Sequence, residues 1–598
     1  MCGIFGYLDT NGETLSSEVL KKMADVIKYR GPDGEGVFIG GSVALGNQRL
    51  AILDIEYGQQ PFVSDDEQVV VVQNGEIFNH VELAKELQGS EFECRTHCDT
   101  EVLLRLYQKH GIEFVSKLNG MFAIAIWDKK IKTMYLIRDR VGEKPLHYHY
   151  LGNRVVFGSE IKSILAAGID KQLDHNALDS FLSFNYVIPP FTMFKNVKHV
   201  MPGTYMKITS AAVEEIRWWD VTNIKLKKRS EAQWISEFNE ILDDAVRIRL
   251  RADVPFGAFL SGGVDSSCIV GLMAKHMNQP VKTFTIGFQD KKFDESPFAQ
   301  IAASRFKTEH VVEKVEANLL GLWPKATYHC DQPHGDVSFL PTYRVAELAS
   351  RKVKMVLTGD GADELFAGYD KYKDYFSCEN AFSVSDQEFQ DSYLENIELF
   401  KSESRGLLYS EQFKENILPN NAKSCIAPLF EKSKGMDRIN QALYIDTMLL
   451  LPGNNLVKPD RMGMAVSIEN RAPFLDYRMV ELAFSMPGSL KLRHGETKYI
   501  YKKAVKELIG NDLTYRKKQM FTVPISEWLK HDLKTMVLDL LLSNKATSRS
   551  LFNKQYVEDL YVSHCEGVAD NTREIRALMA LELWFREFMD DQRSINLP

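Results

Sequence analysis

The spacing of apolar residues along the first third of the chain predicts a mixture of strands and helices. Short apolar runs of β type alternate there with amphipathic stretches of helical period. The β-type runs are 69–73, 121–128, 133–139 and 154–158, and the helical stretches include 17–28 and 99–110. This mixture is typical of an α+β layered sandwich.

The pattern changes after residue 230, where single apolar strands alternate with helices. A helical stretch over 232–250 precedes a strand over 254–260, which favours a parallel α/β sheet, and beyond about residue 375 the chain is mainly helical. Between these parts the periodicity loosens near Pro202 and Gly203. We therefore predict a first domain over 1–210, a linker over 211–230, and over 231–598 a parallel-sheet α/β domain with a helical C-terminal extension.

The length of the chain indicates the number of domains, and its charge and composition indicate which partners and location to expect. A chain of 598 residues is long enough for two domains that each enclose an active site, and its formal net charge is -8. An acidic chain has no general attraction for phosphate backbones or anionic lipid, so we expect neither nucleic acid nor membrane as a partner. The apolar start has no basic region before it, as a signal peptide requires, and eight cysteines are sparse for a disulfide scaffold. We expect a cytoplasmic protein.

A cysteine occupies position 2, directly after the initiator methionine. Removal of Met1 would free the α-amine of Cys2, whose unperturbed pKa of about 7.7 to 8 suits a base for a thiol of about 8.5. Taken alone, a cysteine at this position is more often incidental than catalytic. The segment Asn74-Gly75-Glu76 changes that balance, because it offers an amide, a glycine N–H and a carboxylate where an apolar strand ends. These are the parts of an oxyanion hole beside a receptor for an ammonium group.

Five segments in this order resemble the glutaminase domain of class II, N-terminal-nucleophile amidotransferases. They are 2–6, 30–34, 49–54, 74–79 and 99–101. The resemblance implies that Cys2 attacks the carboxamide of glutamine to form a thioester, while the Asn74 side chain and the Gly75 N–H hold the oxyanion. Three charged residues would bind the carboxylate and the ammonium group of glutamine: Arg49, Glu76 and Asp99.

A loop rich in glycine and serine follows the strand 254–260 and opens a helical stretch. Small residues allow consecutive N–H groups to point into one concavity at a helix N-terminus, which suits a phosphate. The loop lacks the Gly-Lys-Ser/Thr ending of the P-loop and offers a carboxylate, Asp265, which suits a magnesium ion on the phosphates. A glycine-rich turn that serves packing alone is the alternative. The candidate phosphate contacts are Ser261, Gly262, Gly263, Asp265, Ser266 and Ser267.

A second apolar strand, 353–357, ends in an acidic segment that carries Asp360, Asp363 and Glu364. In a parallel sheet, ligands bind at the carboxyl ends of the strands. Carboxylates this close repel one another unless a cation or a positive side chain neutralises them. We therefore expect a ligand and a neutralising charge at this end of the strand.

The phosphate loop resembles the pyrophosphate-binding loop of enzymes that split ATP between its α- and β-phosphates. Together with the segments 281–288, 358–366, 461–476 and 495–498, it resembles the synthetase domain of asparagine synthetases. The resemblance implies that Asp265 and Asp363 hold Mg²⁺ and that Lys498 neutralises the departing pyrophosphate. Nucleotide contacts are implied for Leu260, Ile286, Thr358 and Gly359.

Asp360 departs from the better-studied asparagine synthetases, which have glutamate where the attack of ammonia on the acyl-adenylate is assisted. Aspartate is one methylene shorter, yet it still accepts a proton from ammonia if the backbone or the acceptor lies closer. The resemblance therefore predicts synthesis of asparagine from glutamine, ATP and aspartate through a β-aspartyl-adenylate. A second reading keeps the mechanism but replaces aspartate by a larger carboxylate, such as a cell-wall peptide or a sugar acid.

A third reading, a sensor that binds glutamine or nucleotide without chemistry, is disfavoured because Cys2, Asp265 and Lys498 are all present. Members of the family are often homodimers. We expect a homodimer for this chain from the resemblance alone. The sequence thus predicts a ligase with two separate sites and Mg²⁺ as the metal at the second.

Overall fold

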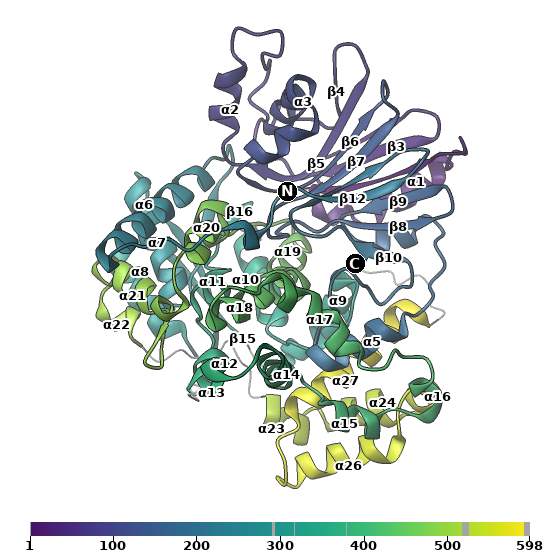
Figure 1. Cartoon of the computed structure of the whole chain (residues 1–598), viewed down its shortest axis with the longest axis vertical. Coiled ribbons are helices and arrows are strands. Elements are labelled where there is room, and N and C mark those ends of the chain that lie inside the picture. Colours follow the sequence, from purple (N-terminus) through teal and green to yellow (C-terminus); the bar gives the residue numbers. More distant parts are fainter. Residues whose placement is uncertain (1, 290–293, 316, 378–379, 517–524, 591–598) are drawn as a thin grey trace.

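The computed structural model describes residues 2–289, 294–315, 317–377, 380–516 and 525–590. The N-terminal domain, in purple and blue, packs on top of a larger domain that contains a parallel sheet and most of the helices (Figure 1). Helices near the C-terminus, in yellow, gather at the end of the larger domain that is far from the N-terminal domain. This is the α+β sandwich followed by a parallel α/β domain that the sequence predicts.

Two antiparallel sheets of six strands form the N-terminal domain. In spatial order the first contains β10 (Val197–His199), β8 (His147–Leu151), β9 (Arg154–Gly158), β1 (Cys2–Asp9), β3 (Val43–Arg49) and β2 (Gly34–Ile39). The second contains β12 (Val213–Arg217), β11 (Thr204–Ile208), β7 (Thr133–Arg138), β6 (Gly120–Asp128), β5 (Val69–Ile77) and β4 (Phe62–Val63). The predicted strands therefore occur, and β1 and β3 join them.

The two sheets stack face to face, and helices cover their outer faces. Ile4 and Leu8 of β1 share one core with Val70 and Val72 of β5, so these side chains fill the layer between the sheets. Phe5, which alternates with them, packs on the other face against α1 (Ser17–Asp25). On the second sheet, α3 (Asp99–His110) covers the outer face of β5. Because both faces of β1 are buried, its sequence has no polar alternation.

The predicted linker over 211–230 contains a strand. β12 (Val213–Arg217) is hydrogen-bonded along β11 as the edge strand of the second sheet. Its two central residues, Glu214 and Glu215, are exposed, and charged side chains of this kind are common on edge strands because they discourage pairing with other chains. In the structure the N-terminal domain therefore extends to Arg217, and α6 (Glu231–Arg249) opens the second domain.

The second domain is built on a parallel sheet of five strands. In spatial order they are β15 (Glu309–Val315), β14 (Lys282–Phe288), β13 (Phe256–Phe259), β16 (Met355–Leu357) and β17 (Glu469–Arg471). The chain runs outward from β13 on one side and then resumes at β16 on the other, so the order reverses between these two neighbours. Such a switch point opens a crevice at the carboxyl ends of the strands, where ligands bind in folds of this kind.

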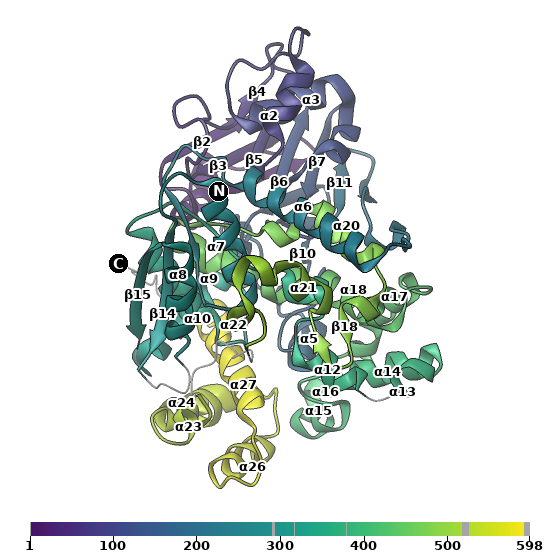
Figure 2. The ribbon, with the colours of Figure 1, turned by 90° about the vertical axis from the view of Figure 1, so that its left-hand side faces the viewer.

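Helices cover both faces of this sheet. α6 and α7 (Val264–His276) share a core with Ala258 on one face, and α10 (Phe339–Ser350) and α19 (Val457–Met464) share a core with Val356 on the other. Figure 2 shows the C-terminal helices α24 (Lys534–Leu542), α26 (Lys554–Cys565) and α27 (Thr572–Trp584) beyond the sheet. They form the helical extension that the sequence predicts.

Within the described part of the chain, none of the helices combines the length and the apolar character needed to span a bilayer.

Candidate active site

The strand register places Cys2 close to Asn74. Cys2 begins β1 and lies opposite Arg49 at the end of β3. Side chains alternate along a strand, so Cys2 is on the same face of β1 as Ile4 and Leu8, which point into the layer between the sheets. Asn74 is likewise on the same face of β5 as Val70 and Val72. The Cys2 nitrogen donates to Asn74 Oδ1 at 3.1 Å. Removal of Met1 would convert this nitrogen into a free α-amine held in the same place.

The thiol of Cys2 is enclosed. Only 5% of the residue is exposed, and burial raises the pKa of the thiol. A thiol with a raised pKa needs a base beside it before it attacks a carboxamide. The nitrogen of the same residue, once freed, can be that base without help from a histidine. This geometry supports the predicted pairing of nucleophile and amine.

Asn74 and Gly75, the predicted donors of the oxyanion hole, both lie on β5. Asn74 Nδ2 donates to Ser159 Oγ at 3.3 Å, and no other described residue accepts the second hydrogen of this amide nitrogen. Gly75 has φ +131°, and a Cβ at this position would lie 1.9 Å from the carbonyl oxygen of Met121. Only glycine fits here, so the chain keeps a backbone conformation that a side chain would prevent. The two predicted donors are adjacent on one strand.

We expect Gly75→Ala to disable the glutaminase site and to lower the thermal unfolding midpoint by roughly 5 °C or more, because positive φ and a steric clash act together. Differential scanning calorimetry and glutamate release measure the two effects. Gly89→Ala is the matched control: Gly89 also has positive φ, +73°, but nothing lies within 4 Å of the position that a Cβ would take there. Equal effects of the two substitutions would refute the role of the close contact at Gly75.

Glu76 and Asp99 offer two carboxylates to an ammonium group. Glu76 Oε2 is buried and has no hydrogen-bond partner among the described residues, which is a state that a cationic ligand would relieve. Burial and then the charge of Asp99 raise the pKa of Glu76. Asp99 opens α3 and accepts hydrogen bonds from Gln73 Nε2 at 3.0 Å and from the Ile77 nitrogen at 2.8 Å, which fix its orientation. The structure thus brings together the two residues predicted to bind the ammonium group.

Arg49 lies beside Cys2 but also holds the following loop. Its guanidinium donates to the carbonyl oxygens of Leu53, Asp54 and Ile55 at 3.0, 2.8 and 3.1 Å. These bonds use three of its five N–H groups. The other donors are those that a carboxylate of glutamine would use, so the predicted role of Arg49 is compatible with its position.

The phosphate loop lies at the switch point of the parallel sheet, between the end of β13 and the start of α7. The Ser261 and Ser266 hydroxyl groups lie 3.1 Å apart across the loop. Gly262 has φ +70°, and a Cβ there would lie 2.3 Å from the carbonyl carbon of Phe298, so the tight turn requires glycine. Further predicted loop residues lie at the start of α7: Gly263, Ser266 and Ser267.

Lys498 joins the two predicted metal ligands. Its Nζ lies 2.7 Å from both carboxylate oxygens of Asp265 and 2.7 Å from Asp363 Oδ1. Burial opposes the positive charge, but the two carboxylates hold the pKa of Lys498 above its usual value. The two carboxylates lie close enough to share one cation. Mg²⁺ is commonly bound by one or two carboxylates together with substrate phosphates, so this pair fits that metal.

The acidic segment after β16 faces the phosphate loop. A Cβ on Gly359 would lie 2.7 Å from Asp265 Cβ, so the two loops touch. Thr358 Oγ1 donates to Asp360 Oδ2 at 2.7 Å, and burial raises the pKa of Asp360. The other two predicted nucleotide contacts, Leu260 and Ile286, are both 2% exposed. Leu260 directly follows β13, and Ile286 lies on β14. The structure brings these segments together at one edge of the sheet.

Arg471, which sequence reasoning missed, contacts both sites. It ends β17, and its carbonyl oxygen accepts a hydrogen bond from the Thr358 nitrogen at 2.9 Å. Its Nη2 lies 3.7 Å from Glu76 Oε1, and its Nε donates to Glu469 at 2.5 Å. One arginine therefore links the predicted ammonium receptor to the nucleotide loop. Arg471 lies inside the recognised segment 461–476, but nothing local distinguishes it from a packing residue.

A buried ionic network also joins the domains next to Cys2. Arg30 is fully buried, and its Nε donates to the Cys2 carbonyl oxygen at 3.1 Å. Its Nη1 lies 2.8 Å from Glu160 and 2.9 Å from Asp460, which belongs to α19 of the second domain. Arg461 also binds Glu160, at 2.9 Å. These pairs tie the backbone at Cys2 to the second domain.

A second arginine that the sequence did not indicate approaches the phosphate loop. Arg516 Nε donates to the Gly262 carbonyl oxygen at 2.8 Å, and its Nη2 binds Glu295 at 2.7 Å. It thus places a guanidinium group against the loop that is predicted to hold phosphate. No motif surrounds Arg516, so no sequence signal could have found it.

Comparison with known proteins decides the family. The asparagine synthase family matches residues 237–586, which is more than half of the chain, and the glutamine amidotransferase domain matches residues 1–219. The chain belongs to the asparagine synthase family. It is accordingly an enzyme, a carbon–nitrogen ligase that takes its amide nitrogen from glutamine.

Relatives named as asparagine synthetases and one relative named as an amidase support this assignment. The chain is 33% identical to the glutamine-hydrolysing asparagine synthetase 1 of Bacillus subtilis (strain 168), over 98% of this chain and 96% of that protein. It is 30% identical to asparagine synthetase 3 of the same organism, over 92% and 93% of the two chains. It is also 29% identical to the amidase chyE of Penicillium rubens, over 88% and 89%. Asparagine synthase family membership thus covers both domains.

Proposed function

We propose that this enzyme converts aspartate, glutamine and ATP into asparagine, glutamate, AMP and pyrophosphate through a β-aspartyl-adenylate. The observation that carries the proposal is the position of Lys498 between Asp265 and Asp363 at the switch point of the sheet. That arrangement suits a pyrophosphate with its metal, and it occurs in one chain with the Cys2 centre. The membership of the chain in the asparagine synthase family supports the same reaction.

In the glutaminase step, Cys2 attacks the carboxamide while its own α-amine takes the thiol proton. Asn74 Nδ2 and the Gly75 N–H stabilise the oxyanion, and the released ammonia leaves a thioester that water hydrolyses to glutamate. Glu76 and Asp99 hold the ammonium group of the substrate. Burial of Glu76 makes this receptor selective for a ligand that brings a positive charge.

In the synthetase step, the phosphate loop binds ATP so that the acceptor carboxylate can attack the α-phosphate. Asp265 and Asp363 would hold Mg²⁺, which supplies charge neutralisation on the phosphates. Lys498 neutralises the departing pyrophosphate, and Asp360 accepts a proton from the ammonia that attacks the adenylate.

The described cysteines are all free thiols, which suits the cytoplasm as the location. A homodimer is expected from the family alone.

A second candidate keeps the mechanism and replaces aspartate with a larger carboxylate. Two observations favour it. Asp360 is shorter than the glutamate of the better-studied family members, which changes the distance to the acceptor, and the chain resembles an amidase as well as asparagine synthetases along most of its length. This candidate differs from the first only in the acceptor.

Incubation with Mg²⁺, ATP, aspartate and glutamine labelled at its amide nitrogen tests the proposal. We expect labelled asparagine and an equal amount of AMP, because each amide formed consumes one adenylate. Mass spectrometry of the products measures both. Labelled ammonia and glutamate without AMP would reject aspartate as the acceptor, and a panel of larger carboxylates would then identify the acid that restores AMP formation.

A further inference from the structure

Two small cavities lie where the domains meet. The larger, about 30 Å³, is lined by residues of both domains, among them Glu143, His147, His334 and Asp460. The smaller, about 10 Å³, lies beside the synthetase loop. A water needs roughly 10 to 15 Å³, so each cavity has room for a molecule of the size of water or ammonia.

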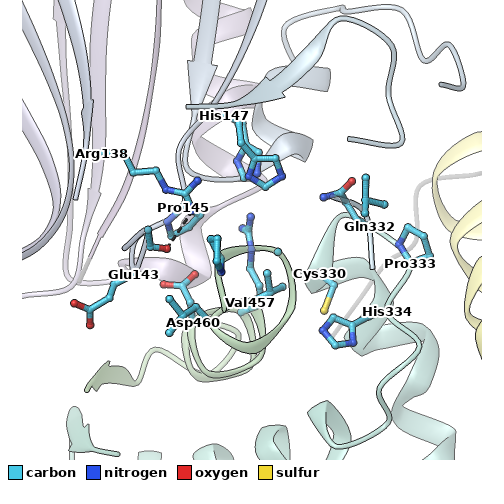
Figure 3. A pocket seen from close by; sticks show the side chains of 17 residues that line it. Arg138, Glu143, Pro145, His147, Cys330, Gln332, Pro333, His334, Val457 and Asp460 are labelled. Carbon is cyan, nitrogen blue, oxygen red and sulfur yellow. Dashed lines mark hydrogen bonds between the residues drawn. The ribbon is translucent and has the colours of Figure 1, made fainter. Parts of the chain in front are cut away.

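Glu143 is common to both cavities. It lies in the loop between β7 and β8 of the N-terminal domain, and its nitrogen donates to Asp139 Oδ1 at 2.9 Å, which fixes the loop. Figure 3 shows its carboxylate turned away from the larger cavity and from His334. The smaller cavity is lined by Glu143 together with Thr358 and Asp360. A carboxylate of the first domain thus approaches the proposed site of ammonia attack in the second.

We propose that Glu143 is a second proton acceptor for the amidation step, supplied by the N-terminal domain beside Asp360. The inference rests on the proposed function. The ammonia lone pair forms the new C–N bond to the acyl carbon, and the single proton that the resulting ammonium must lose passes to the Glu143 carboxylate in place of Asp360. The bond between the acyl carbon and the AMP oxygen then breaks with its electron pair on AMP, and Glu143 returns its proton to water.

Two observations make this role chemically reasonable. The side chain of Asp360 is one methylene shorter than glutamate, so a second carboxylate on the same cavity compensates for its shorter reach. The Glu143 residue is only 6% exposed, and burial, followed by the charge of Asp139, raises its pKa to about 8. A base works best when its pKa lies near the working pH, because it is then both available and strong enough.

Several charged groups face Glu143 and set its titration. Lys144 and Asp139 lie on its own loop, Arg249 belongs to α6, and Asp476 precedes α20 (Tyr477–Ser485). The acidic groups raise the pKa of Glu143, whereas Arg249 and Lys144 lower it. Two more carboxylates line the cavities: Asp460 of α19 and Asp360. Since the base form of Glu143 is the ionised one, the amidation rate should rise as the pH increases through about 8.

The test compares Glu143→Gln with the wild-type enzyme, using whichever acceptor the wild type amidates. Glutamine preserves the shape and removes the base, so we expect amide formation to fall by roughly 100-fold, the low end for loss of a general base. The loss should be the same with glutamine and with added ammonium. Acceptor-dependent exchange of pyrophosphate into ATP and release of glutamate should keep their wild-type rates, which also shows that the variant folds.

The pH profile separates a chemical role from a structural one. The rise in amidation near pH 8 should disappear in Glu143→Gln and partly return in Glu143→Asp. Glu574→Gln is the matched control, because partial burial also raises the pKa of Glu574 but that residue lies on α27 and lines neither cavity. It should retain the wild-type rate and profile.

Two results would overturn the proposal. One is a Glu143→Gln enzyme with the wild-type amidation rate and an unchanged pH profile. The other is a loss confined to glutamine as the nitrogen source, which would place Glu143 in the transfer of ammonia and not in its attack. Failure of the wild type to amidate aspartate would refute only the proposed acceptor, because the comparison then continues with the acid that is amidated.

Discussion

Replacing Cys2 with alanine should abolish amide synthesis from glutamine and leave synthesis from added ammonium unchanged. The substitution removes the nucleophile, so we expect the rate of glutamate release to fall by on the order of 10⁴-fold or more, as for loss of other catalytic nucleophiles. The synthetase site lies at the switch point of another sheet and keeps its own residues. Parallel assays with glutamine and with ammonium chloride, each following AMP, measure the separation.

Cys94→Ala provides the control for this experiment. Cys94 is a half-buried free thiol of the same domain and lies outside the proposed site. Its replacement should leave both nitrogen sources usable. If Cys2→Ala instead reduced the two activities equally, the chemical independence of the two centres would be wrong.

Replacing Asp265 with asparagine should stop synthesis with either nitrogen source. Asparagine is nearly isosteric, but it removes one of the two charges that face Lys498 and one proposed oxygen ligand of Mg²⁺. We expect AMP formation to fall by about 10²- to 10³-fold, the cost of losing one electrostatic contact to a reacting group. Glutamate release in the absence of ATP should persist, because the glutaminase residues are untouched. Pyrophosphate exchange into ATP over a range of Mg²⁺ concentrations measures the effect.

Asp243→Asn is a suitable comparison for that variant. Asp243 also binds a lysine, with its Oδ1 2.9 Å from Lys275 Nζ, but this pair lies on the partly exposed surface of α6 and α7. Surface pairs of this kind contribute little, so the rate should stay near that of the wild type. Synthesis that survives in Asp265→Asn at saturating Mg²⁺ would show that Asp265 is not an essential ligand.

Elements with a strong local period were predictable from the sequence. The helix predicted over 99–110 is α3, with the same ends, because its apolar spacing and its first-turn carboxylates are local signals. The strand predicted over 69–73 continues in the structure to Ile77. The prediction stopped early because Gln73, Asn74 and Glu76 are polar, although their backbone still pairs with β6. The catalytic segment is thus the polar end of a strand.

The partners across the domain boundary could not be predicted. Arg30 and Asp460 are 430 positions apart and meet only after both domains have folded. Glu143 lies in a loop with no recognisable chemistry, and its importance follows from the cavity that Thr358 and Asp360 complete. β1 was missed because Gly3 and Gly6 interrupt its apolar run, and glycine is depleted in strands. The sequence carries motifs for each centre separately, whereas their connection depends on long-range packing.

The buried pair between Arg30 and Asp460 has a consequence for how this protein can be divided. Arg30 has two carboxylate partners, Glu160 of its own domain and Asp460 of the second domain. A fragment that ended near residue 219 would leave Arg30 without Asp460 while Arg30 still holds the Cys2 carbonyl. The nucleophile therefore depends on a scaffold encoded more than 400 positions later. We therefore expect the N-terminal domain alone to hold the backbone at Cys2 less firmly than the intact polypeptide does.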